Sequence, residues 1–247
     1  MTIGSEWRHY AECGSTSDLA RAWALDTEAP APDGAVVTAD MQTKGRGRRG
    51  ASWQAAGGEN LLMTVVLRPN YPISGAWRLG YVAALAVTDA LAEMGLTPAL
   101  KWPNDVLLDG NKTCGVLVET VPLPNGEWAA ILGIGVNVNQ LEFPDAETFV
   151  YPPTSLRQSS GRVFAMDDVR ERVWEWLERW EDIHRSAGEF DPIAAGWRRY
   201  LAVGAKVRRG AEAAQLQGIE SDGGARVLRS DGTFTVWRTV DGEEGSQ

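Results

Sequence analysis

The segment Leu61–Leu67 (LLMTVVL) constrains the fold most, because six of its seven residues are apolar. A strand of this composition is buried on both faces, so other elements must pack above and below it. Further short strands are predicted at Ala35–Ala39, Val106–Leu108, Cys114–Glu119 and Trp128–Val138. The turn Pro124-Asn125-Gly126 contains Asn-Gly, a strong hairpin signal. The strands are therefore expected to form a mostly antiparallel sheet.

Two amphipathic helices are predicted beside this sheet. Trp77–Met94 repeats its apolar residues at helical spacing, and Gly95 follows where a helix-ending glycine belongs. Asp167–Phe190 also has one apolar helical face. Asp168 is expected to be its N-cap, with Glu171 at the capping-box distance. Helices combined with a mostly antiparallel sheet define the α+β class.

The chain changes character near Leu201, where short strands begin to alternate with Asp-Gly turns. These strands are predicted at Lys206–Arg208, Ala213–Ile219, Arg226–Leu228 and Thr233–Trp237. Closely spaced strands of this kind indicate a small β-barrel. We therefore expect two domains, residues 1–200 and residues 201–247.

The composition excludes several classes of protein. Lys and Arg number 24 and Asp and Glu 33, so the net charge is −9, a poor basis for general nucleic-acid binding. Cys13 and Cys114 are too few for a disulfide framework, and with His9 and His184 they do not form a four-ligand zinc site by themselves. No apolar run approaches 18 residues, and the N-terminus lacks the apolar core of a signal peptide. We expect a cytoplasmic protein with reduced thiols and no membrane association.

A basic, glycine-rich loop is the most unusual stretch of this acidic chain. Four of the six residues from Lys44 to Arg49 are basic. One interpretation is a solvated, flexible charge run. A second is a dinucleotide fingerprint, but the sequence after Gly50 (ASWQAAGG) does not open a helix. A third is an anion clamp, in which glycines allow close approach and arginines bind phosphate or carboxylate oxygens.

Two further motifs favour the anion clamp. Lys101-Trp102-Pro103-Asn104-Asp105 and Lys112 offer two cations, an amide and a carboxylate, a set suited to polyphosphate with Mg²⁺. A plain turn with solvated lysines is the alternative. In Gly133-Ile134-Gly135 two glycines alternate within an apolar strand, which indicates either close approach of a flat ligand or a bulge.

Taken together, these motifs resemble those of biotin–protein ligases. The matching segments are Ser15-Thr16-Ser17, Gln42–Gly50 with Trp53, Gly58–Leu61, Lys101–Asp105, Lys112–Glu119 and Gly133–Asn139. Each is weak alone, but their joint occurrence in order is highly specific. The resemblance is strong from Ser15 to Asn139, while the C-terminal strands match by pattern only.

The resemblance implies a class II synthetase-like catalytic domain followed by an SH3-like barrel. It also implies two chemical steps, in which biotin attacks the α-phosphate of ATP and a lysine of a biotin carboxyl carrier domain then takes the biotinyl group from biotinyl-5′-AMP. Two anions must meet in the first step, so basic groups and Mg²⁺ are needed to offset their repulsion. Both attacking groups belong to substrates, so no protein nucleophile is required.

Site residues follow from the resemblance. Those implied for catalysis are Arg46, Arg48 and Lys112. Those implied for biotin are Ser15, Thr16, Ser17, Gln42, Gly45, Arg46, Trp53, Lys112, Gly115 and Gly133. Those implied for ATP or the adenylate are Arg46, Arg48, Arg49, Lys101, Asn104, Asp105, Lys112 and Asn137. Asn104 and Asp105 are also the implied Mg²⁺ ligands.

Two positions depart from the family pattern, and three alternatives stay open. Ala51 replaces a usual basic residue, and Ser17 replaces a usual Asn. The alternatives are a lipoate–protein ligase, a nucleic-acid-binding module that uses Arg46–Arg49, and a binder that has lost turnover. Only about 14 residues precede Ser15, too few for the DNA-reading winged helix of some relatives, so no repressor function is expected.

Overall fold

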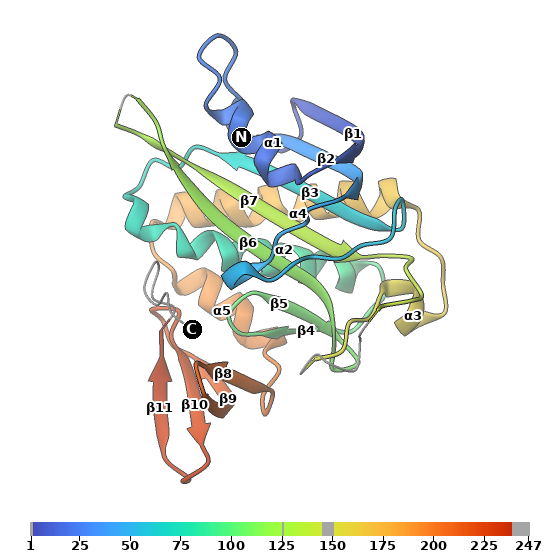
Figure 1. The fold of residues 1–247 in the computed structure, drawn as a ribbon. Helices are drawn as coiled ribbons and strands as arrows, with labels where there is room; N and C mark the ends of the chain where they lie inside the picture. Colours follow the sequence, from blue (N-terminus) through green and yellow to red (C-terminus); the bar gives the residue numbers. More distant parts are fainter. Residues whose placement is uncertain (1, 125, 145–150, 239–247) are drawn as a thin grey trace.

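A seven-stranded sheet forms the centre of the protein (Figure 1). The structure is a computed structural model that describes residues 2–124, 126–144 and 151–238. The strand order is β1-β2-β3-β7-β6-β5-β4, in which β1 and β2 are parallel and all other neighbours are antiparallel. The strands are β1 (Trp7–Cys13), β2 (Ala35–Gln42), β3 (Asn60–Leu67), β4 (Pro98–Lys101), β5 (Asp105–Leu108), β6 (Asn111–Pro122) and β7 (Trp128–Asn137).

The predicted buried strand is confirmed in β3, all eight residues of which are buried. The mostly antiparallel sheet and the β6–β7 hairpin are confirmed as well, although Asn125 of the predicted turn lies outside the described residues. β1 and β4 were not predicted. β1 is an edge strand with largely exposed residues, so its sequence carries no clear apolar alternation.

Helices cover the two faces of the sheet. In Figure 1, α2 (Trp77–Glu93) and α4 (Met166–Ala187) lie behind it and share the larger apolar core with β3, β6 and β7. α1 (Thr16–Ala24) packs on the opposite face, in a smaller apolar cluster. Gly95 follows α2 with a φ of +82°, which confirms the predicted helix-ending glycine.

The predicted start and end of α4 are wrong. The helix begins one residue before the predicted range, with Ala165 at the N-cap and no side-chain cap. Asp168 lies in the first turn, where a negative charge favours the helix dipole without capping the helix. The helix also ends at Ala187, because Gly188 adopts a φ of +66°.

A smaller antiparallel sheet follows α5 (Asp191–Tyr200). Its order is β11-β10-β9-β8, with β8 (Lys206–Arg209), β9 (Glu212–Ile219), β10 (Ala225–Arg229) and β11 (Phe234–Trp237). The Tyr81 hydroxyl joins the two sheets, since it accepts from Trp102 Nε1 (2.7 Å) and donates to Gly223 O (2.7 Å). These strands match the predicted ones closely, while closure into an SH3-like barrel stays a prediction.

The remaining described elements are short. α3 (Leu156–Ser160) is capped by the Ser155 side chain, and η1 (Arg48–Gly50) and η2 (Ile73–Gly75) are single 3₁₀ turns. Among the described residues, no helix is both long and apolar enough to cross a membrane.

Buried ionisable groups gather near the C-terminal end of α4. Arg185 pairs with Glu181 (Nε–Oε1, 2.8 Å) and with Asp33 (Nη1–Oδ2, 2.9 Å). Burial raises the pKa of Glu181 to about 7 against the opposing effect of Arg185. Burial and nearby arginines lower the pKa of His184 to about 4. Between about pH 4.5 and 6.5, the contribution of Glu181 to the free energy of unfolding therefore falls as the pH rises, while the contribution of His184 increases.

Glu181→Gln should stabilise the protein relative to wild type as the pH rises. The carboxyl group binds its proton more tightly in the folded state, so ionisation above about pH 5 penalises only the wild-type chain. The difference in the free energy of unfolding should shift by about 2–3 kcal/mol in favour of the variant between pH 5 and 8. Urea unfolding across this range measures it. Glu175→Gln, an exposed change on α4, is the control, and parallel curves for wild type and Glu181→Gln would contradict the assignment.

Candidate active site

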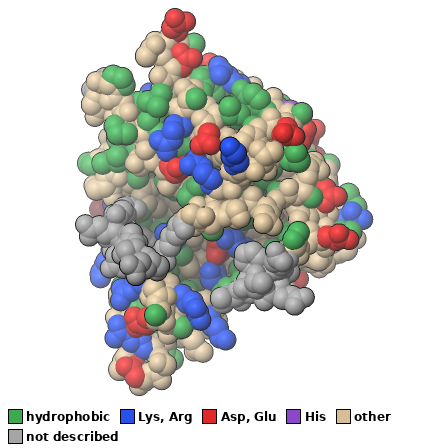
Figure 2. Space-filling view, in the orientation of Figure 1, with side chains coloured by type: hydrophobic (Ala, Val, Ile, Leu, Met, Phe, Trp, Pro, Cys, Tyr) green, Lys and Arg blue, Asp and Glu red, His purple; other side chains and the backbone are tan. Residues whose placement is uncertain are grey.

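The predicted site residues gather on the sheet face that α1 covers. Gly133, Gly135 and Asn137 share the β7 face with Ile131, which packs in the α1 cluster. Residues 43–57 cross in front of this face in Figure 1. Figure 2 shows basic and acidic side chains interleaved on the upper part of this side of the molecule, with a hollow below them.

A buried polar network lies at the N-terminal end of α1. The Gln42 Oε1 atom accepts from the Thr16 backbone N–H (2.7 Å) and hydroxyl (3.0 Å). The Thr64 hydroxyl contacts those of Thr16 (2.8 Å) and Ser17 (3.2 Å). Ser15 is buried beside them as the N-cap residue. Thr64 was not among the predicted site residues, although it is the only polar residue of Leu61–Leu67.

Two glycines form a flat floor in the centre of the sheet. Gly115 on β6 pairs with Gly135 on β7 in a regular register, so the bulge alternative is wrong. The flat group above them is the indole of Trp53. A Cβ atom at Gly135 would lie 2.6 Å from this ring, and one at Gly115 would lie 2.9 Å from it. Close approach of a flat group therefore requires glycine at both positions.

The basic loop folds into a short hairpin, residues 45–53, which we call the lid hairpin. Arg46 and Ser52 form an antiparallel bridge, Gly47 N–H donates to Ala51 O (2.7 Å), and Trp53 N–H donates to Gly45 O (3.0 Å). The segment Arg48–Gly50 is a 3₁₀ turn, not the start of an α-helix. The dinucleotide fingerprint therefore does not apply.

The lid arginines contact acidic and amide side chains. Arg46 binds both carboxylate oxygens of Glu119 (3.1 and 2.8 Å) and one of Asp18 (2.9 Å). Arg48 Nη1 donates to Asn104 Oδ1 (3.2 Å). The side chain of Arg49 lies outside the described residues. Glu119 and Asp18 were not predicted as site residues, because only the fold brings them to Arg46.

One buried carboxylate holds both predicted lysines. Asp105 Oδ2 lies 2.8 Å from Lys101 Nζ, and Oδ1 lies 2.7 Å from Lys112 Nζ. Burial opposes ionisation of Asp105, but the ammonium groups of Lys112 and Lys101 outweigh it and hold the pKa of that carboxyl below its usual range. The three groups together carry one net positive charge. The structure thus joins Lys101, Asp105 and Lys112 in one cluster, which we call the lysine cluster, with Asn104 next to Asp105 in the chain. Residues 102–104 do form a turn, but the two lysines are ion-paired and not simply solvated, as that alternative required.

The two predicted Mg²⁺ ligands already have partners. Both Asp105 oxygens accept from lysines, and Asn104 Oδ1 accepts from Arg48. No group of three or more His, Cys, Asp or Glu residues within the described ranges could hold a metal ion. These residues do not fit a resident metal site.

Asn137 lies at the far end of the floor. Its Nδ2 donates to Thr154 O (3.0 Å), while its buried Oδ1 has no hydrogen-bond partner among the described residues. A buried acceptor of this kind is costly unless a ligand or water pairs with it. It is therefore available to a donor group of a bound molecule.

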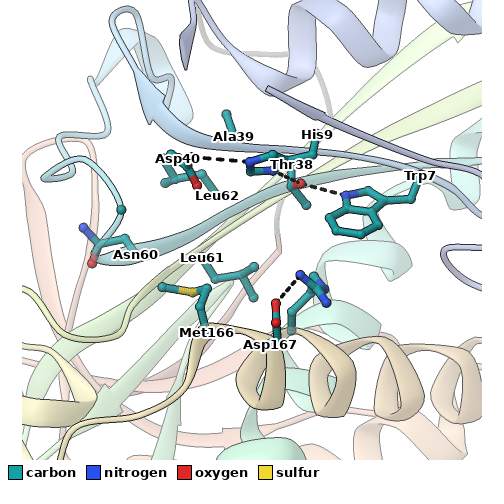
Figure 3. Close-up of a pocket in the computed structure, with 12 residues that line it drawn as sticks. Trp7, His9, Thr38, Ala39, Asp40, Asn60, Leu61, Leu62, Met166 and Asp167 are labelled. Carbon is teal, nitrogen blue, oxygen red and sulfur yellow. Dashed lines mark hydrogen bonds and ion pairs between the residues drawn. The ribbon is translucent and has the colours of Figure 1, made fainter. Parts of the chain in front are cut away.

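A separate pocket of about 260 Å³ opens on the other face of the sheet (Figure 3). It lies between the β1–β3 strands and the start of α4, where Met166 and Asp167 face it. His9 contacts Thr38 (2.9 Å) and Asp40 (3.4 Å) on its wall. None of the predicted site residues lines it, so it is distinct from the floor and lid described above.

Comparison with known proteins agrees with this geometry. The profile of the Biotin/lipoate A/B protein ligase family matches residues 14–139, the part of the chain that builds the floor, the lid hairpin and the lysine cluster. The chain belongs to this family.

Relatives within the family extend the match along most of the chain. The biotin--[acetyl-CoA-carboxylase] ligase of Paracoccus denitrificans is 35% identical over 86% of this chain and 91% of its own length. The bifunctional ligase/repressor BirA of Bacillus spizizenii is also 35% identical, over 84% of this chain. This chain spans 65% of the length of that relative.

Solved structures show the same fold. The biotin protein ligase from Aquifex aeolicus in complex with biotin and ATP superposes with a TM-score of 0.76 and 27% identity, covering 95% of this chain and all of that one. The seven-stranded sheet, its helices and the small C-terminal sheet therefore form the biotin ligase fold.

Gly135→Ala should loosen the lid hairpin. The added methyl group would meet the Trp53 indole 2.6 Å away and push it off the floor. Trypsin should then cleave the exposed arginines of the hairpin several-fold faster, while the melting temperature stays near that of wild type. Gly80→Ala is the control, since its Cβ would meet only Val118, at 3.6 Å. Equal cleavage of wild type and Gly135→Ala would show that the indole does not anchor the hairpin.

Proposed function

We propose that this protein is an ATP-dependent, AMP-forming biotin–protein ligase. It activates biotin to biotinyl-5′-AMP and transfers biotin to a lysine of a biotin carboxyl carrier protein domain. The observation that carries the proposal is the lysine cluster at Asp105, which lies beside the glycine floor under an arginine-bearing lid hairpin. The Aquifex aeolicus relative, whose structure contains biotin and ATP, supports this choice of substrates.

The first step joins two anions. A carboxylate oxygen of biotin attacks the α-phosphorus of ATP, and the bond to the bridging oxygen of pyrophosphate breaks. At about 4 Å, unscreened like charges repel by roughly 4 kcal/mol at an effective dielectric of 20. Lys112, Lys101 and Arg48 offset this repulsion and stabilise the charge that develops on the phosphate oxygens. Mg²⁺ enters as the counter-ion of ATP, held by phosphate oxygens and water, which is its usual mode of binding.

The second step transfers the biotinyl group. The neutral amine of the acceptor lysine attacks the carbonyl carbon of the mixed anhydride, the bond to the phosphate oxygen breaks, and AMP leaves. The amine loses one proton as the amide forms. Before transfer the anhydride must be kept from water, and the lid hairpin above the floor is placed to do this.

The remaining residues bind and orient the substrates. The buried hydroxyl and amide groups of Ser15, Thr16, Ser17 and Gln42 are assigned to the ureido ring of biotin, together with the close approach at Gly45, Gly115 and Gly133. Trp53 is assigned to the valeryl chain, and the free Oδ1 of Asn137 to the adenosine end. Arg46 and Arg49 are assigned to the anionic groups.

The proposal extends to the organisation and setting of the protein. Residues 1–200 hold the site and residues 201–247 form the small C-terminal domain. We assign it ligation alone, because a net charge of −9 does not favour DNA. We assign it to the cytoplasm, because a chain with only two cysteines is typical of a compartment where thiols stay reduced. Binding of an operator by the purified protein would contradict this part.

Pyrophosphate exchange into ATP tests the proposed function. Exchange that requires biotin together with Mg²⁺ is the expected result. Exchange with lipoate instead of biotin would keep the mechanism but overturn the substrate. If the folded protein supports exchange with neither acid, it is a binder without turnover, and Ala51→Arg would then be the first reversion to test.

Lys112→Ala should abolish adenylation without unfolding the protein. Its ammonium group lies 2.7 Å from Asp105 at the edge of the floor, and its side chain is one-third exposed and is not part of the apolar core. Removal of one positioned donor should lower biotin-dependent exchange by about 100- to 1,000-fold. Lys112→Arg keeps the charge and is the control. Exchange within a factor of about three of wild type would remove Lys112 from the catalytic set.

Arg48→Gly should release the intermediate. Arg48 extends from the lid hairpin to Asn104, beside the lysine cluster, where it can reach the adenylate phosphate. A lost hydrogen bond to a charged group corresponds to roughly 10- to 100-fold faster dissociation of biotinyl-5′-AMP. Release of labelled adenylate during gel filtration measures this rate. An unchanged rate would show that Arg48 does not retain the intermediate.

A further inference from the structure

Glu119 lies on β6 under the lid hairpin and has no part in the chemistry described above. Its side chain is 21% exposed and accepts two hydrogen bonds from Arg46, from Nη1 (3.1 Å) and Nη2 (2.8 Å). Asp18 of α1 lies 2.9 Å from the same Nη2. Arg21 Nη2 also donates to Glu119, at 3.2 Å.

These contacts neutralise Arg46 before any substrate arrives. Arg46, Arg21, Glu119 and Asp18 sum to zero charge. Arg46 donates one hydrogen bond from Nη1 and one from Nη2 to the two oxygens of Glu119, and its Nη2 lies in ion-pair contact with Asp18. A guanidinium group binds a carboxylate most strongly through two parallel hydrogen bonds, and Glu119 already takes this mode. A substrate anion can bind this Nη1–Nη2 edge only by replacing Glu119.

The lid hairpin ties this exchange to the floor. Arg46 forms the backbone bridge to Ser52, and the next residue, Trp53, places its indole over Gly115 and Gly135. A ring bound on this floor must displace the indole, so the same hairpin has to move when a ligand enters. Because the lid hairpin carries both residues, we expect a shift of the hairpin to release Arg46 from Glu119 and Trp53 from the floor together.

We propose that Glu119 is a positioning residue that holds Arg46, and with it the lid hairpin, by competing with the carboxylate of the acid substrate. The inference rests on the proposed function, because it takes biotin as that acid. Glu119 does not touch the reacting atoms. It sets how readily Arg46 becomes available to them.

Glu119→Gln tests the competition. The amide keeps the size of the side chain but removes the charge and one of the two acceptors, so Arg46 is released more readily. The Kd for biotin, measured by calorimetric titration, should fall roughly three- to tenfold. The Kd for biotin methyl ester, which has no carboxylate to compete for Arg46, should not change.

Three variants separate competition from other effects. Glu119→Asp retains the charge and should restore a Kd closer to that of wild type. Glu12→Gln removes an exposed carboxylate of β1 and should change nothing. In an Arg46→Gln background, Glu119→Gln should have no effect on biotin, since the group that is competed for is gone. Asp18→Asn should lower the Kd in the same direction and replaces Glu119→Gln if that variant does not fold.

Three outcomes would overturn the inference while the wild-type protein binds biotin. Weaker binding of biotin by Glu119→Gln would show that Glu119 supports the bound state. An equal gain for biotin and its methyl ester would assign the effect to a change of the floor. A gain that persists in the Arg46→Gln background would assign it to direct repulsion between Glu119 and the ligand. Wild-type protein that binds no biotin would instead refute the proposed function itself.

Discussion

The paired lysines held by Asp105 are the interaction on which the rest of the site depends. β4, β5 and β6 pair so that Lys101 lies opposite Asp105 and Asp105 opposite Gly115, which brings two cations to one carboxylate beside the floor. Two ammonium groups so close together would repel each other without the buried carboxylate between them. With it, the cluster keeps one net positive charge and a fixed geometry. In the proposed function, this positive charge offsets the repulsion between the carboxylate of the acid and the triphosphate of ATP.

Groups of the chain itself occupy the site. The Trp53 indole covers the glycine floor, and Glu119 and Asp18 occupy the guanidinium of Arg46. The lid hairpin carries both contacts, so substrate binding exchanges internal partners for external ones and does not fill an empty cavity. The cost of that exchange lowers the affinity for substrate, but the same contacts order the lid hairpin, whose glycine-rich sequence favours a flexible chain.

Part of this arrangement could be predicted from the sequence. The predictable features are those in which one physical requirement determines the residue type at a position. The alternating Gly133 and Gly135 indicated either close approach of a flat ligand or a bulge. The regular register excludes the bulge, and the flat group that the structure shows over Gly135 is the indole of Trp53. The apolar run of β3 and the glycine after α2 were equally direct signals. The partners of Arg46 could not be predicted, since Glu119 and Asp18 lie far from it in the chain, and the motif Lys112–Glu119 does not reveal what its final glutamate contacts. The prediction of Asp168 as the N-cap was wrong because aspartate is favourable both at the N-cap and within the first turn of a helix.

Amide hydrogen exchange of residues 45–53 is the most direct test of a site closed by its own lid hairpin. In the ligand-free protein, the Trp53 N–H, bonded to Gly45 O at 3.0 Å, and the Gly47 N–H, bonded to Ala51 O at 2.7 Å, should exchange more slowly than in an unstructured peptide of the same sequence. Biotin should then change this protection. Exchange at the rate of the unstructured peptide before any ligand is added would show that the hairpin is not closed. It would contradict the conclusion that groups of the chain itself occupy the site.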